Sequence, residues 1–133
     1  MERQDLVLLM EAGYVYMGMG RFDEAREVFE GISVLSPASE IPLVALGTVF
    51  FATKQFERAV AFYKKALALK GDSSFARAYL GEALLFKGKK SEGIKELEKA
   101  SLLDPSGTAG EFARSLMEAV KNGFVPPTKE SHA

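Results

Sequence analysis

A spacing of 34 residues recurs along the chain and constrains its fold more than any single motif. Three glycines keep this spacing, namely Gly13, Gly47 and Gly81. Large apolar residues keep it too, at Tyr16, Phe50 and Leu84. A fixed period of about 20 to 50 residues is the signature of repeat architectures, in which each unit packs mainly on its neighbours. The chain is therefore predicted to form a stack of similar units.

Each unit is predicted to be a hairpin of two helices. Apolar or small residues recur at steps of three and four, as at Leu9, Ala12, Gly13 and Tyr16, which is the spacing of one helix face. Short polar turns rich in Gly and Lys divide each unit into two such helices. We expect Gly13 and its equivalents to let the two helices of a hairpin approach closely, because a side chain there would hold them apart. The repeats span residues 6–39, 40–73 and 74–107.

The segment after the third repeat has one apolar and one polar face, and is predicted to be a helix at about 108–122. A helix of this kind shields the end of a repeat array. We expect one all-α domain over residues 1–123, forming a short right-handed superhelix with a concave apolar groove, and an irregular tail at 124–133.

The composition argues against several classes of function. Lys and Arg number 17 against 18 for Asp and Glu, a net charge of -1, so no positive excess is available to bind nucleic acid. The chain has no cysteine, and its only histidine, His132, stands beside the C-terminus. The run GKKS lacks the spacing of a phosphate-binding loop. We therefore expect no enzyme activity, no catalytic or metal site, and no cofactor.

Localisation is predicted from the absence of membrane signals. No apolar stretch reaches the roughly 18 residues that a membrane span requires. The apolar patch near the N-terminus has acidic residues on both sides, unlike a cleaved signal peptide. We expect a cytoplasmic protein.

The first helix of each repeat carries a second apolar stripe beside its packing stripe. We expect this second stripe to face the concave side, because a surface helix of a monomer normally has one polar face. The predicted groove consists of Val7, Met10, Tyr14, Met17, Ile41, Val44, Thr48, Phe51, Phe75, Ala78, Glu82, Leu85 and Phe86.

An apolar surface of this size indicates an interaction site. An amphipathic helix or an extended apolar segment of another protein fits such a groove. Two alternatives are the chain's own terminal segments and a second copy in a homodimer. Glu82 and Thr48 are the polar exceptions; they would either orient a ligand or contact only water.

The units resemble tetratricopeptide repeats. The first repeat fits the family pattern best, with Gly13, Tyr16, Ala25, Phe29 and Pro37 at the characteristic positions. The third repeat departs from it at Arg77, where a large apolar residue is usual. Family members that bind the C-terminal carboxylates of large cytosolic chaperones present Lys, Arg and Asn in the groove. Those positions are apolar here, so that role is not expected.

Within this class the chain is similar to the small export chaperones of bacterial type III secretion. The similarity is carried by the segments GRFDEAREVFEGISVLSP, LGTVFFATKQFERAVAFYKKA and EFARSLMEAVKNG. It implies a cytoplasmic chaperone that keeps an apolar, self-associating export substrate from polymerising. Translocator chaperones usually carry a helical region ahead of the first repeat. Because repeat one begins near Leu6, the resemblance favours the needle-subunit type.

The resemblance implies a helical segment of the needle subunit in the groove, with a second small cochaperone as a further partner. Two alternatives stay open: a chaperone of a translocator protein, and an adaptor or scaffold whose apolar face mediates homodimerisation or assembly.

Overall fold

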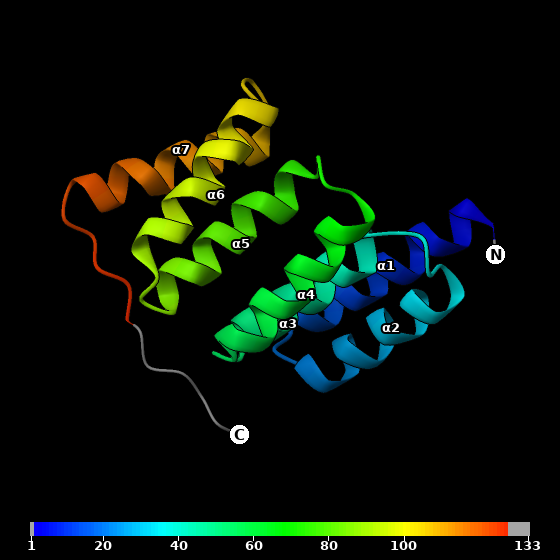
Figure 1. Cartoon of the computed structure of the whole chain (residues 1–133). Helices are drawn as coiled ribbons and strands as arrows, with labels where there is room; N and C mark the ends of the chain where they lie inside the picture. The colour runs from blue at the N-terminus through cyan, green and yellow to red at the C-terminus, as the bar shows by residue number, and fades with distance from the viewer. Residues whose placement is uncertain (1, 128–133) are drawn as a thin grey trace.

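The computed structural model describes residues 2–127, and all regular structure in that part is helical (Figure 1). The seven helices are α1 (Arg3–Gly18), α2 (Phe22–Leu35), α3 (Ile41–Ala52), α4 (Phe56–Leu69), α5 (Ser74–Phe86), α6 (Lys90–Leu103) and α7 (Thr108–Lys121). The predicted all-α fold is confirmed.

Helices α1 to α6 form three hairpins that stack side by side. Each odd-numbered helix packs on the even-numbered helix that follows it, and α2 and α4 also contact the first helix of the next hairpin. Helix α7 packs on α5 and α6, so the α1/α2 hairpin and α7 lie at opposite ends of the stack (Figure 1). The predicted hairpins and terminal helix are present.

The repeated glycines allow the close approach that their spacing predicted. A methyl group built on Gly13 would overlap the ring of Phe29, and one on Gly81 would lie 2.7 Å from Cγ of Leu97. Gly47 faces the ring of Tyr63 in the same way. Each glycine thus makes room for a large side chain from the second helix of its own hairpin.

The turns inside the three hairpins share one backbone conformation. The residues concerned stand 34 positions apart, and their φ angles are 74° at Gly20, 60° at Lys54 and 83° at Gly88. This left-handed region suits glycine, whereas a residue with a Cβ atom is strained in it. The second repeat therefore folds with a less suitable residue in its turn.

Three hydrophobic clusters follow one another along the stack. The first joins α2 to α3 through Phe29, Ile32 and Leu46, with α1 packed against it. The second joins the α3/α4 hairpin to α5 around Tyr63 and Leu80. The third joins α5, α6 and α7. Each cluster is shared between neighbouring units, as in a repeat array.

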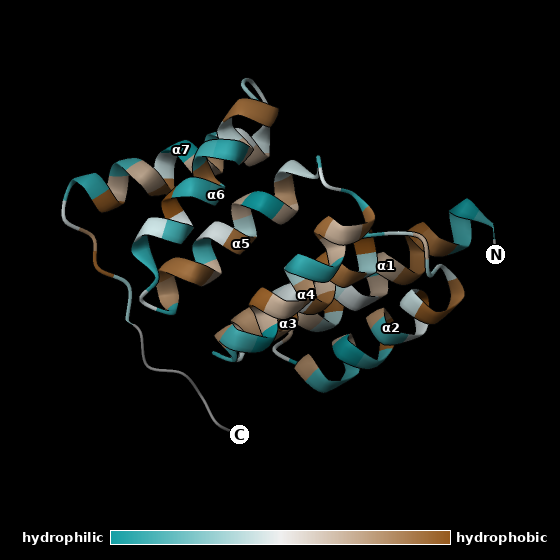
Figure 2. Ribbon diagram, in the orientation of Figure 1, coloured by the Kyte–Doolittle hydropathy of each residue, from teal (hydrophilic) through white to brown (hydrophobic). Residues whose placement is uncertain are grey.

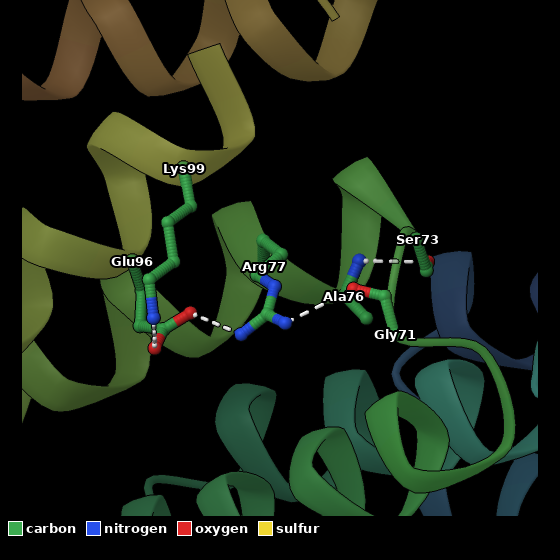
Figure 3. Close-up of polar contacts among 6 residues, drawn as sticks. All are labelled: Gly71, Ser73, Ala76, Arg77, Glu96 and Lys99. Carbon is green, nitrogen blue, oxygen red and sulfur yellow. Dashed lines mark hydrogen bonds and ion pairs between the residues drawn. The ribbon is translucent and has the colours of Figure 1, made fainter. Parts of the chain in front are cut away.

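In the third repeat, Arg77 replaces the usual large apolar residue and forms polar contacts instead of apolar ones. Its guanidinium donates hydrogen bonds to Oε2 of Glu96 at 3.0 Å and to the carbonyl oxygen of Gly71 at 3.0 Å (Figure 3). Nζ of Lys99 lies 3.4 Å from the other carboxylate oxygen of Glu96. The Ser73 hydroxyl accepts from the backbone N–H of Ala76 and caps α5. A half-buried polar network thus ties α5 to α6 and to the preceding loop.

The predicted packing stripe of α1 is only partly correct. Gly13 is buried and Tyr16 is half-buried, but Leu9 and Ala12 are exposed. They belong to an apolar stripe on the outer side of α1, which we call the α1 edge. The α1 edge consists of Leu8, Leu9, Ala12, Val15 and Met19.

Residues 124–127 form no helix, and the rest of the predicted tail, with His132, lies outside the described residues. Figure 2 shows that hydrophilic residues recur on α2, α4 and α6, whereas hydrophobic residues cover much of α1 and α3.

Candidate binding groove

Two adjoining cavities open along the first helices of the hairpins. The larger, of about 480 Å³, lies between α1 and α3, and most of its wall is apolar: Leu6, Val7, Met10, Tyr14, Ile32, Ile41 and Pro42. The smaller, of about 280 Å³, joins α1, α3 and α5 and is lined by Tyr14, Glu40, Ile41, Val44, Ser73, Phe75 and Tyr79. Tyr14 and Ile41 line both cavities. The two cavities therefore form one groove across three helices that are far apart in sequence.

Six of the thirteen predicted groove residues line these cavities: Val7, Met10, Tyr14, Ile41, Val44 and Phe75. Four of the six, Val7, Tyr14, Ile41 and Phe75, are 44–54% exposed. Large apolar side chains with this exposure can contact a guest without moving the backbone.

Four further predicted residues are partly buried and support the groove wall. Met17 packs against the first hydrophobic cluster. The rings of Phe51 and Phe86 lie 5.0 Å apart, and both contact the ring of Phe56. This aromatic group holds α3, α4 and α5 together. Thr48 donates a hydrogen bond to the carbonyl oxygen of Val44 at 3.1 Å.

Two predicted groove residues do not face the groove. Ala78 is fully buried and Leu85 is 3% exposed, and both belong to the third hydrophobic cluster with Ala113 and Val120 of α7. Their assignment to a partner surface is wrong for this conformation. The reason is that α7 packs on α5 and covers these two positions, whose equivalents in the earlier repeats are only half-buried.

Tyr79 is a groove residue that the sequence reasoning missed. It lines the smaller cavity, and its ring packs at 5.9 Å from Phe75, 6.0 Å from Tyr63 and 5.7 Å from Phe112. The spacing of Phe75, Tyr79 and Glu82, four and three residues apart, places them on one helix face. That spacing was the available signal.

Several polar groups lie next to the groove residues Val44 and Tyr79. The Thr48 hydroxyl and the Tyr63 hydroxyl lie 3.3 Å apart, and since Thr48 donates to Val44, Tyr63 donates in this pair. Burial raises the pKa of the Tyr14, Tyr63 and Tyr79 hydroxyls, so all three are neutral donors at physiological pH. Burial also raises the pKa of the Glu82 carboxyl to about 7.

The part of the chain that the structure describes has neither a metal site nor a membrane-spanning helix. No three His, Cys, Asp or Glu side chains come together there as a metal site. None of the helices described is both long enough and apolar enough to cross a bilayer.

Residues 10–74, from α1 to the start of α5, match the tetratricopeptide repeat family. Two curated relatives also match. One is anaphase-promoting complex subunit 3 of Schizosaccharomyces pombe, 27% identical over 93 residues, and the other is the uncharacterized protein ycf37 of Cyanophora paradoxa, 30% identical over 82 residues. The matches cover 70% and 60% of this chain, but only 14% and 48% of the relatives' lengths. These matches agree with the predicted repeat class.

Among solved structures, the fold matches type III secretion translocator chaperones over nearly the whole chain. SycD of Yersinia enterocolitica gives a TM-score of 0.81 with 22% identity, over 91% of this chain and 95% of SycD. PcrH of Pseudomonas aeruginosa gives 0.80 with 18% identity, over 91% and 95%. The first tetratricopeptide domain of Spaghetti (RPAP3), bound to an HSP90 peptide, gives 0.75 with 24% identity, over 90% and 96%. The chain thus has the tetratricopeptide-repeat fold, which it shares with these three proteins.

Proposed function

We propose that this protein is a cytoplasmic chaperone that holds an apolar segment of a type III secretion translocator in its groove. The observation that carries the proposal is the continuous apolar groove across α1, α3 and α5. The fold adds support, because SycD has been solved with a peptide of the translocator YopD and PcrH with the chaperone binding region of PopD. That the needle subunit is the client, and that a second small cochaperone joins the complex, both stay predictions.

The chemistry of the groove favours an apolar guest. An unbranched thioether such as Met10 adapts to guests of different shape. Tyr14 and Ile41 stand where the two cavities meet, and aromatic residues at the centre of an interface commonly contribute most of the binding energy. A bound segment would cover the half-exposed side chains of the groove. Its own apolar side chains would be covered at the same time, so the segment could not associate with other copies of itself.

Co-expression with the translocator of the same secretion system tests the proposal. We expect a soluble complex with one chaperone per translocator, and we expect Ile41→Glu to abolish it, because a carboxylate would stand between the two cavities. Val34→Glu is the matched control, since Val34 is 79% exposed on α2, away from the groove. A complex that survives Ile41→Glu, while circular dichroism shows both variants folded, would contradict the proposal.

A second candidate function is a scaffold that assembles through its apolar face, and the α1 edge favours it. Val15 is 60% exposed and Met19 59% exposed, so a second copy could cover this stripe. Sedimentation of the purified protein separates the candidates: Val15→Glu would dissociate a dimer built on the α1 edge, but would leave the translocator complex intact.

A further inference from the structure

Glu82 does not line either cavity, but it lies on α5 one helical turn beyond Tyr79, which does, at a position that apolar packing does not explain. It follows Phe75 and Tyr79 on one face of α5, and both of these residues line the smaller cavity. Its carboxylate is close enough to the Tyr63 and Tyr79 hydroxyls to raise their pKa values. The corresponding residues of the first two repeats are Tyr14, which lines both cavities, and Thr48, whose hydroxyl lies 3.3 Å from that of Tyr63.

The Glu82 carboxylate has no partner of opposite charge. None of the ion pairs or side-chain hydrogen bonds found among residues 2–127 involves it. The titratable groups that face it are Tyr63 from α4 and Tyr79 from α5. A carboxylate that is largely removed from water without a cation is destabilised in its charged form, which agrees with the direction of its pKa.

Glu40 is the one charged residue among those that line the smaller cavity, and it pairs with Lys70 at 4.0 Å. Arg3 lines the larger cavity, where Glu11 is present as well. The residues that line the smaller cavity thus include the aromatic rings of Tyr14, Phe75 and Tyr79 and the paired Glu40, but no basic side chain that would bind an acidic peptide.

We infer that Glu82 determines which guests the groove accepts, by pairing with a lysine or arginine side chain that stands between apolar residues of the bound segment. This inference rests on the proposed function and adds the chemistry of the guest. A cation at this position would meet the Glu82 carboxylate and the ring of Tyr79, and ion pairs and cation–π contacts both strengthen when water is excluded. An acidic side chain at the same place would meet Glu82 as a like charge.

Selection of peptides from a random display library tests the inference without a known client. The library is panned on the wild-type protein, on Glu82→Gln and on Glu98→Gln. Glu98 is exposed on α6, outside the groove. The Gln side chain keeps the size of Glu, and circular dichroism checks that each variant is folded.

The expected result is a wild-type pool of apolar peptides with one basic residue at a fixed place. Glu98→Gln should select the same pool, and Glu82→Gln should lose the preference for the basic residue. Two outcomes would overturn the role of Glu82 and leave the proposed function standing. In one, the wild-type protein selects apolar peptides without a preferred basic residue. In the other, Glu82→Gln selects the same basic residue as the wild-type protein. A lack of enrichment on all three proteins would overturn the proposed function and, with it, the inference.

Affinities of one selected peptide then measure the pairing directly. The peptide is compared with a copy in which norleucine replaces its basic residue. Glu82→Gln should weaken binding of the basic peptide by about tenfold, and should leave the affinity of the norleucine copy nearly unchanged. Equal losses for the two peptides would show that Glu82 acts on the fold of the groove rather than on the charge of the guest.

Discussion

The first and second repeats carry the same outer stripe, but only the second repeat buries it. The α1 edge is exposed, whereas the residues 34 positions later are buried or half-buried at the same place on α3: Pro42, Leu43, Leu46, Val49 and Thr53. The difference comes from the preceding hairpin, because α2 packs on α3 through Phe29 and Ile32. A periodic sequence therefore predicts periodic burial only where a neighbouring unit stands on both sides.

Placing the same substitution in both stripes should give the largest contrast. Val49 is 2% exposed and Val15 is 60% exposed. We expect Val49→Asp to lower the free energy of unfolding by about 4 kcal/mol, because it buries an unpaired carboxylate. Val15→Asp should change it by less than about 0.5 kcal/mol. Urea unfolding of the two variants measures both values, and similar losses would show that the α1 edge is covered in the folded protein.

Glu82 stands at the position that Tyr14 and Thr48 hold in the first two repeats. This difference between the repeats gives a second contrast, in which the effect on stability depends on pH. The folded-state pKa of Glu82 is raised from 4.5 to about 7. Between these values the unfolded carboxyl is ionised while the folded one holds its proton, so stability falls as the pH rises through this window. We expect Glu82→Gln to raise the free energy of unfolding by roughly 1–2 kcal/mol near pH 8, after allowing for the remaining solvent exposure, and by little near pH 4.

Thermal unfolding of Glu82→Gln across this pH range checks the prediction, with the exposed Glu98→Gln as control. A gain for Glu82→Gln that is the same near pH 4 and near pH 8 would contradict it, because a pH-independent gain cannot arise from ionisation of the carboxyl.

The hairpin turns should give the smallest effect. Lys54 has the same left-handed conformation that Gly20 and Gly88 have in the other two repeats. Lys54→Gly relieves this strain but adds backbone freedom to the unfolded chain. We expect a net gain of about 0.5 kcal/mol in the free energy of unfolding. Lys54→Ala is the comparison, since it removes the side chain but keeps the Cβ atom. A loss of stability in both variants would show that contacts of the Lys54 side chain outweigh the strain of its backbone.

The fold could be predicted from the sequence because its determinants are local and repeated. The same contact explains the spacing of Gly13, Gly47 and Gly81. In each hairpin, a large side chain of the second helix lies where a Cβ atom would otherwise be. Exposure of Leu9 and Ala12 was not predicted, because it depends on what lies beside α1 rather than on the repeat itself.

Five of the residues predicted for the groove in the first two repeats line its cavities, whereas only Phe75 of those predicted in the third repeat does. Ala78 and Leu85 occupy the same stripe as Val44 and Phe51, but α7 packs over them. The position of α7 depends on contacts between segments that are separated in sequence, which the repeat pattern does not contain. Tyr79 was missed for the opposite reason, since it lies on the groove face of α5 beside the stripe that the repeats share.

The sparse packing of α1 has a consequence for how occupancy of the groove can be observed. Gly13 is the one fully buried residue of α1, against six in α3 and seven in α5. The free energy needed to open a helix locally falls with the contacts it loses, so the amide hydrogens of α1 should exchange with solvent faster than those of α3 and α5. Because α1 forms one wall of the groove, a bound segment must hold that wall in place. Slower exchange of the α1 amides would then report occupancy residue by residue.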